Sequence, residues 1–166
     1  AGDDELSRAD AEPGATVFYA EAERTQFFAE TFSFFVNAAG QIATQPLVGS
    51  EEFALGGTTF GRGFDPSEAL GDNGVGLTVE LRKDERFGFG AVDVDAQFYG
   101  FGDVGRVWNL DDGEPSAKTL SSVGAGVRGV FNDTLLLGVE VAATTSELAR
   151  TGDNEVRFFF TAQQRF

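Results

Sequence analysis

The chain has 166 residues, among them 22 glycines and 18 phenylalanines, and it contains no Cys, Met or His. Its 12 basic and 27 acidic residues give a formal charge of −15, which argues against nucleic acid as a partner because phosphate binding needs Lys and Arg. Without His and Cys, Ser-His and Cys-His catalytic arrangements and most zinc sites are excluded. We therefore expect no enzymatic activity, no metal and no cofactor. The aromatic and glycine content favours an all-β protein.

Residues 1–14 are acidic and polar, and we expect them to be a loop or tail that precedes the folded part. They do not have the features of a signal peptide, and no run of 18 apolar residues predicts a transmembrane helix. The first two strands are predicted at about 15–24 and about 31–46, joined by a short polar connection at 25–30. A long loop at about 47–74, rich in glycine, follows them.

The next two predicted strands alternate strictly between apolar and polar residues. One begins near residue 75 and the other ends near residue 108, with a short polar turn expected at 83–88. Successive side chains of a strand point to opposite faces, so each strand has one apolar and one polar face. The apolar face carries Val75, Leu77, Val79, Leu81, Val92, Val94, Ala96 and Phe98, and the polar face carries Thr78, Glu80, Arg82, Asp93, Asp95, Gln97 and Tyr99.

Three further strands are predicted at about 118–131, 134–144 and 155–166. Asn132 and Asp133 form a tight turn between the first two, and a longer loop leads to the third. The apolar face of the last two strands carries Leu135, Leu137, Val139, Val141, Ala143, Val156, Phe158, Phe160 and Phe166.

Seven long strands, with short turns at one end and long loops at the other, are typical of an outer-membrane β-barrel. A membrane-spanning strand needs about 9–11 residues, and most of the predicted strands reach this length. A soluble β-sandwich or a small ligand-binding barrel shows the same alternation. Periodicity alone leaves these alternatives open.

Three other motifs carry little weight. Gly-x-Gly-x-x-Gly occurs at 100–105 and 124–129, but a dinucleotide site needs this turn between a strand and a helix, and both stretches lie inside predicted strands. Asp93 and Asp95 share a strand face, as a pair for acid–base chemistry does. The loop residues 111–114 offer oxygen ligands of the kind that calcium uses. Neither acidic group has supporting spacing, and a solvated acidic surface is the simpler interpretation.

Residues 41–82 carry an ordered series of more specific motifs. They read Gln-x-Ala-x-x-Pro-Leu, Ser-Glu-x-Phe-x-Leu-Gly-Gly, Arg-Gly-Phe, Gly-Asp-x-Gly and Glu-Leu-Arg, and Phe-x-Asp-x-Gly follows at 101–105. In this order they closely resemble the C-terminal barrel part of two-partner secretion transporters, the haemolysin secretion/activation family. Its relatives are the outer-membrane barrel insertases. The resemblance is in register over about residues 15–166.

The resemblance implies an all-β fold, an antiparallel transmembrane β-barrel segment without a helical domain. Family members have a 16-stranded barrel preceded by periplasmic polypeptide-transport-associated domains, and this chain is similar to the last seven meandering strands. Seven strands make an open sheet, and a bilayer does not tolerate open edges. A piece of a longer barrel and a small protein that closes by another route both stay possible.

The resemblance also implies a site inside the barrel. In the family a long loop folds into the lumen, and its Arg-Gly-aromatic tip contacts the Asp of a strand motif. Carried onto this chain, the loop is about 47–74 and the tip is Gly61, Arg62, Gly63 and Phe64. The partner is Asp103, in the strand motif that contains Phe101 and Gly105.

Two observations bear on this implied site. Residue parity places Asp103 on the polar face, and it places Gly124 and Gly126 on the inner face of the next strand, where they leave room for a loop backbone. The family often has Val or Ile before the Arg of the tip, whereas this chain has Gly61. The resemblance therefore does not determine how the tip packs. A guanidinium–carboxylate pair suits a latch because it is directional, and water in the lumen would weaken the pair enough for rearrangement.

The function that the resemblance implies is export of a large secreted protein across the bacterial outer membrane, through the barrel lumen and without ATP. The implied partners are this secreted substrate, outer-membrane lipid and the barrel-assembly machinery, for which Phe166 is the expected C-terminal signal. Two alternatives stay open: an insertase that assembles other barrels, and a β-protein fragment without transport activity.

Overall fold

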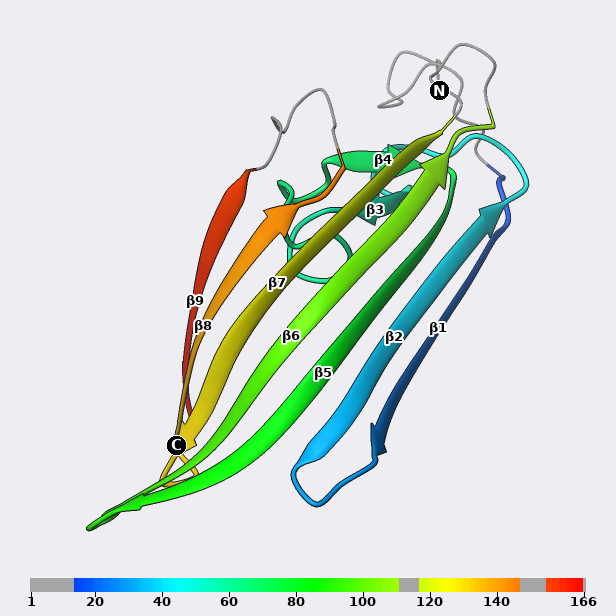
Figure 1. Ribbon diagram of the computed structural model, residues 1–166. Coiled ribbons are helices and arrows are strands. Elements are labelled where there is room, and N and C mark those ends of the chain that lie inside the picture. Colours follow the sequence, from blue (N-terminus) through cyan, green and yellow to red (C-terminus); the bar gives the residue numbers. More distant parts are fainter. Residues whose placement is uncertain (1–13, 111–116, 147–154, 166) are drawn as a thin grey trace.

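The computed structural model describes residues 14–110, 117–146 and 155–165. Seven antiparallel strands form one curved sheet in which neighbours follow the order β1-β2-β5-β6-β7-β8-β9 (Figure 1). The predicted all-β meander of seven strands is confirmed. Among the described residues, no helix is long and apolar enough to cross a membrane. The strands are β1 Val17–Phe27, β2 Phe32–Ala43, β5 Asn73–Phe89, β6 Val92–Trp108, β7 Lys118–Phe131, β8 Leu135–Thr144 and β9 Val156–Gln164.

The turn between β5 and β6 differs from the prediction. Residues 83–88 lie inside β5, which stays paired with β6 as far as Phe89 opposite Val92, and the chain reverses at Gly90, whose φ is 67°. The polar residues that suggested a turn instead pair across the hairpin, as Arg86 Nε does with Asp95 Oδ1 at 2.5 Å. The tight turn at Asn132 and Asp133 is present, with φ of 46° and 59°.

The two faces of the sheet have the polarity of a membrane barrel. Leu77 and Val79 on the outer face are each 37% exposed, whereas Thr78 and Glu80 on the inner face are each 4% exposed. In a soluble β-sandwich the apolar face packs inward. The apolar outer face continues over the other strands and includes Phe34, Val75, Leu81, Phe98, Val104, Val123, Val127, Val139, Val141, Phe158 and Phe160.

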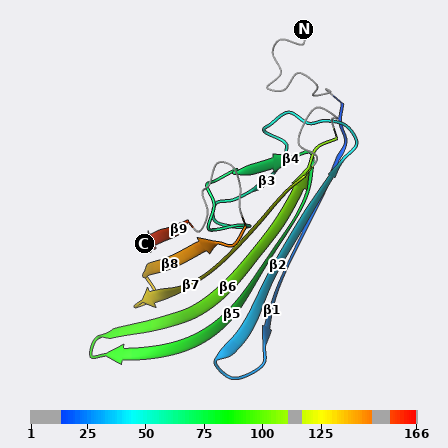
Figure 2. The same cartoon turned by 45° about the horizontal axis from the view of Figure 1, so that its top comes forward.

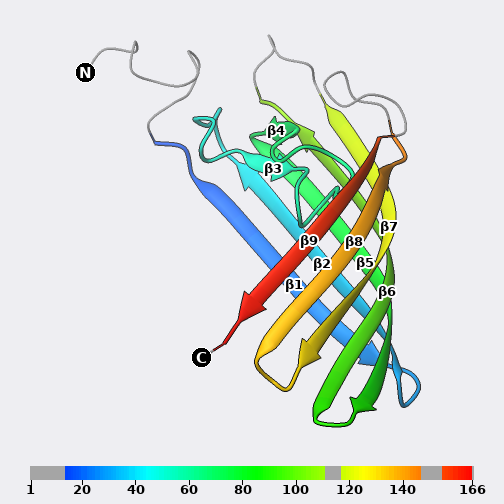
Figure 3. The ribbon, with the colours of Figure 1, turned by 90° about the vertical axis from the view of Figure 1, so that its left-hand side faces the viewer.

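The chain between β2 and β5, residues 44–72, lies on the concave face of the sheet near one end (Figures 2 and 3). We call this segment the inner loop. It corresponds to the loop expected at about 47–74, and it contains a small antiparallel sheet that the sequence did not predict. This sheet pairs β3, Phe53–Leu55, with β4, Ala69–Gly71.

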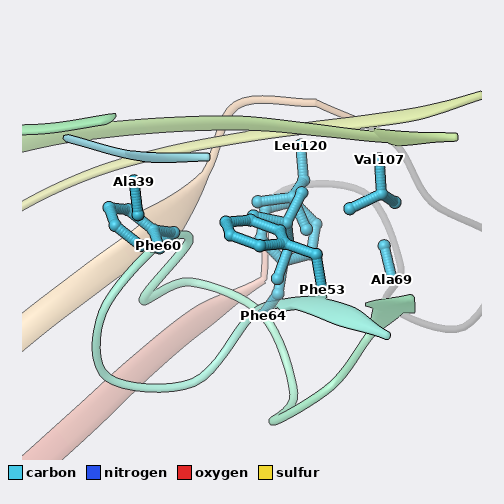
Figure 4. Close-up of a cluster of buried hydrophobic side chains, with 8 residues drawn as sticks. Ala39, Phe53, Phe60, Phe64, Ala69, Val107 and Leu120 are labelled. Atoms are coloured by element: carbon cyan, nitrogen blue, oxygen red, sulfur yellow. The ribbon is translucent and has the colours of Figure 1, made fainter. Parts of the chain in front are cut away.

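The inner loop and the sheet share one apolar cluster. Figure 4 shows Phe53 and Phe64 of the loop directed toward the strands, and Phe60 beside Ala39 of β2. Leu55 and Ala69 are fully buried, and Phe64 is 1% exposed. The loop is therefore packed against the concave face by a core of its own. The cluster contains Ala39, Phe53, Leu55, Phe60, Phe64, Ala69, Val107 and Leu120.

Candidate functional site: an arginine from the inner loop held by three strands

Glycine shapes the tip of the inner loop. Gly56, Gly57 and Gly61 have φ of 98°, 87° and 95°, which residues with a side chain rarely adopt. Backbone hydrogen bonds close the tip on itself, because Gly56 N donates to Phe60 O at 2.7 Å and Phe64 N donates to Gly61 O at 2.9 Å. The glycine-rich stretch therefore forms a compact turn that presents one long side chain to the sheet.

That side chain is Arg62, and its first partner is Asp103 of β6. Arg62 Nη2 donates to Asp103 Oδ1 at 2.9 Å, and Arg62 Nε donates to Asp103 Oδ2 at 3.1 Å, so the contact is bidentate. The backbone N of Arg62 also donates to Oδ2, at 3.0 Å. The structure thus brings together the two residues that the resemblance paired.

Three further side chains of the sheet contact the guanidinium. Arg62 Nη1 donates to Glu80 Oε1 at 2.9 Å and to Glu140 Oε2 at 3.0 Å. The ring of Phe101 lies under the guanidinium, with its centroid 3.4 Å from Cζ, as in a cation–π contact. Tyr99 donates its hydroxyl to Glu140 Oε2 at 2.9 Å and so orients that carboxylate.

The pair between Arg62 and Asp103 is shielded from solvent. The two side chains are 7% and 0% exposed, so the expected hydrated pair is wrong for the docked loop. Ser122 donates its hydroxyl to Asp103 Oδ2 at 3.1 Å, and the hydroxyl of Thr78 lies 3.0 Å from Asp103 Oδ1 and 2.7 Å from the loop carbonyl of Thr59. Burial opposes the charge of Arg62, but the hydrogen bonds and charges of the surrounding carboxylates outweigh it and raise the pKa of the guanidinium above its ordinary value.

Two other arginines complete the charge balance on the concave face. Arg82 Nη2 lies 2.7 Å from Glu80 Oε2, and Arg128 Nη2 lies 3.6 Å from the same oxygen. With Arg62, three guanidinium groups therefore face three carboxylates. Withdrawal of the loop would leave this cluster with one uncompensated negative charge.

Glycines on the sheet accept the apolar side chains of the inner loop. A Cβ at Gly76 would lie 2.6 Å from Phe60 Cγ, and a Cβ at Gly105 would lie 2.4 Å from Leu55 Cδ2. Gly105 of the strand motif thus leaves the space that Leu55 of the loop occupies, and we call a glycine of this kind a seat. The three seats on β5 and β6 are Gly74 for Phe53, Gly76 for Phe60 and Gly105 for Leu55.

The role expected for Gly124 and Gly126 needs correction. A Cβ at Gly124 would meet the ring of Phe101 at 2.4 Å, and one at Gly126 would meet Tyr99 Oη at 2.5 Å. The space above these glycines is filled by aromatic rings of the neighbouring strand and not by loop backbone, because the rings of β6 lean across the shared face. The loop backbone instead approaches β8 at Gly63, where a Cβ would lie 2.9 Å from the backbone of 143–144.

A buried aspartate fixes the base of the inner loop. Asp72 is 0% exposed, and its Oδ1 accepts a hydrogen bond from Leu47 N at 2.7 Å. Its Oδ2 accepts from Leu110 N at 2.8 Å, just beyond β6. This residue of the Gly-Asp-x-Gly motif therefore joins the start of the loop, its end and the exit of β6.

The remaining expectations have different outcomes. The two carboxylates of Asp93 and Asp95 do not act as an isolated pair, since Asp95 is bound to Arg86. Phe166, the acidic residues 111–114 and most of the segment 1–14 lie outside the described residues. Within 14–110, 117–146 and 155–165, no group of three or more acidic side chains could hold a metal ion.

Sequence reasoning missed Glu80 and Glu140 as partners of Arg62. Parity had placed Glu80 on a polar strand face, and Glu140 alternates in the same way with Val139 and Val141; this alternation was the available signal. Their meeting point depends on pairing register, which sets Thr78 opposite Asp103 and Asp103 opposite Ser122. It also depends on the curvature that brings β8 toward the loop.

Comparison with known proteins gives one match. The family model for the haemolysin secretion/activation protein ShlB/FhaC/HecB matches residues 6–129, which is well over half of the chain. The matched range includes the inner loop, Arg62 and Asp103. No curated protein gives a significant match, and no solved structure does.

Proposed function

Because the chain belongs to the haemolysin secretion/activation family, whose members are two-partner secretion transporters, we propose that it forms part of a channel wall for a secreted protein. In this proposal the concave face lines the lumen and the inner loop closes it as a latch. Residues 15–166 are the C-terminal part of the barrel, and residues 1–14 precede them as an acidic loop or tail. Proteins of this family reside in the bacterial outer membrane, and we assign the chain to the same place.

The observation that carries the latch is the set of contacts around Arg62. One loop side chain is held by carboxylates from β5, β6 and β8, at 2.9 to 3.1 Å. A polypeptide could not occupy the same part of the concave face while the loop lies there. Release of the loop breaks the contacts of Arg62, the ion pair between Asp65 and Arg157 and the shared apolar cluster, and it exposes the wall behind them.

The apolar outer face supports the proposals for two further partners, outer-membrane lipid and the barrel-assembly machinery. Its apolar side chains suit contact with lipid, which we propose as their environment, and insertion by the barrel-assembly machinery follows from a membrane-barrel fold. Phe166 stays a proposed assembly signal. We propose that export needs no ATP, as the family resemblance implies; both Gly-x-Gly-x-x-Gly stretches lie within β6 and β7 and not before a helix that could bind phosphate. The family match favours secretion over the barrel-insertase alternative.

Replacement of Arg62 by Ala in the full-length transporter tests the latch. Removing one partner of a buried ion pair costs about 3–5 kcal/mol, so the docked loop should lose a large part of its stability. We expect Arg62→Ala to reduce the secreted amount of the partner protein severalfold, while the amount of heat-modifiable barrel in the outer membrane changes little. Immunoblots of culture medium and of outer membranes measure the two quantities.

Arg86→Ala is the matched control, because Arg86 is an exposed arginine of β5 that contacts Asp95 near the turn at Gly90. It should change neither quantity. An equal loss of secretion and of inserted barrel in Arg62→Ala would contradict the latch and leave Arg62 a purely structural role.

A further inference from the structure

The groups that surround the guanidinium of Arg62 all belong to the sheet. Its direct partners come from β5, β6 and β8, and Thr78 of β5 and Ser122 of β7 contact the carboxylate of Asp103 behind them. We call this set the guanidinium receptor; it comprises Thr78, Glu80, Phe101, Asp103, Ser122 and Glu140.

The receptor matches the shape of a guanidinium and not only its charge. Asp103 accepts two parallel N–H groups, while Glu80 and Glu140 accept the two N–H groups of the opposite nitrogen. The Phe101 ring supplies a flat surface 3.4 Å from Cζ. A planar guanidinium satisfies these contacts together, whereas the point charge of an ammonium cannot be bidentate and stacked.

The receptor stays assembled without the loop. Thr78, Asp103 and Ser122 are direct neighbours in the ladders of β5, β6 and β7. Without the loop, Ser122 keeps its hydrogen bond to Asp103, and the hydroxyl of Thr78 loses the Thr59 carbonyl as an acceptor and keeps Asp103. Tyr99 likewise keeps its hydrogen bond to Glu140. Removal of Arg62 therefore leaves a preorganised anionic site on the wall.

Electrostatics favours refilling of that site by a cation. Without Arg62, the three carboxylates of the receptor face only Arg82 and Arg128, both of which lie on the side of Glu80. Asp103, whose side chain is 0% exposed with the loop in place, then has no cation in contact among the described residues. Carboxylates in excess over their neighbouring cations attract a further cation.

We propose that the receptor binds an arginine side chain of the polypeptide in transit once Arg62 has left. This inference rests on the proposed function, since a polypeptide is what passes the wall there, and arginine is the side chain that carries a guanidinium. The receptor then has two alternative occupants, the loop arginine at rest and a substrate arginine during export. While a substrate arginine is bound, the loop cannot dock again.

A small-molecule probe tests the receptor by itself. The full-length Arg62→Ala protein in detergent is titrated with ethylguanidinium and, separately, with ethylammonium at equal ionic strength. Heats of binding and the shift in unfolding temperature are measured. We expect saturable binding of ethylguanidinium, at least about tenfold tighter than ethylammonium, since loss of a bidentate, stacked contact is worth this much or more. The wild-type protein, whose receptor is filled, should bind neither.

Two variants in the Arg62→Ala background keep the test decisive. Asp103→Asn removes the bidentate acceptor, and Glu140→Gln changes a carboxylate at the rim, where the side chain is already 14% exposed. Both should weaken ethylguanidinium at least about tenfold. Equal binding of the two probes by Arg62→Ala, or binding that is unchanged in both variants, would overturn the proposal.

The same variants separate this inference from the proposed function. If Arg62→Ala loses secretion but does not bind ethylguanidinium, the latch stands and the receptor proposal fails. If it binds ethylguanidinium selectively while secretion is normal, the receptor is supported and the latch fails. A further measurement uses the wild-type protein and trypsin, which cuts after Arg62 only when the loop leaves. An arginine-rich peptide of D-residues, which trypsin does not cut, should accelerate this cleavage, and a D-lysine peptide of equal length should not.

Discussion

Gly61 explains how the tip of the inner loop fits the sheet without the branched residue that the family resemblance led us to expect. Its φ of 95° is one that a β-branched residue rarely adopts. Leu120 Cδ1 of β7 lies 2.3 Å from where a Cβ at this position would be. Leu120, which is 0% exposed, therefore fills the space that a side chain at position 61 would need. The positive φ of Gly61 and the close packing of Leu120 against it together fix the position of the adjacent Arg62.

Gly61→Val should therefore loosen the tip. Strained φ and overpacking each cost about 1–3 kcal/mol, and each 1.4 kcal/mol of opening free energy raises cleavage of the open form about tenfold. We expect the rate of tryptic cleavage after Arg62, followed by mass spectrometry of the full-length protein, to rise at least about tenfold. Gly61→Val combined with Leu120→Ala should recover only part of the protection, because space is restored but φ is not. An unchanged cleavage rate in Gly61→Val would contradict this account.

The strands were predictable from alternation, and the smaller elements were not. Strict periodicity located β7 and β8 almost to the residue, since one apolar face and a tight turn fix the register of a hairpin. The extension of β5 through residues 83–88 was missed because charged residues that pair across strands have the composition of a turn. β3 and β4 have three residues each, too few for a period to be read. Their place depends on glycine seats that only the folded sheet creates.

The glycine seats predict how the inner loop docks as an element. Gly76→Ala would place a Cβ 2.6 Å from Cγ of Phe60, and a buried ring packed against other rings cannot yield cheaply. We expect tryptic cleavage after Arg62 to rise about tenfold or more, which corresponds to overpacking of about 1–3 kcal/mol. Gly102→Ala on β6 is the control, because a Cβ there meets nothing within 4 Å, and it should leave the rate unchanged. Equal rates in the two variants would mean that the loop does not depend on these seats.

At the scale of the whole molecule, the polarity of the sheet decides between a soluble and a membrane protein. The buried inner face contains Ser33, Asn37, Thr78, Glu80 and Asp103, whereas most of the large exposed side chains are apolar. A soluble fold would have the reverse arrangement. Sequence periodicity could reveal two faces but not which one is covered, because that depends on the inner loop. In the described sheet β1 and β9 each have one neighbouring strand, and in a bilayer their free edges need partners.

Adjacent residues of β9 test the assignment of the faces. Phe160 is on the outer face and 71% exposed. Thr161 points to the inner face, where its Cβ lies 3.7 Å from the position of a Cβ at Gly138. An arginine on the lipid face of a barrel costs about 2–4 kcal/mol at the bilayer midplane, while the inner face already accommodates Arg128 and Arg157. We therefore expect Phe160→Arg in the full-length protein to lower the fraction of heat-modifiable, membrane-inserted barrel severalfold, and Thr161→Arg to leave it nearly unchanged. If Thr161→Arg were the more damaging of the two, the apolar face would be a core and not a lipid contact.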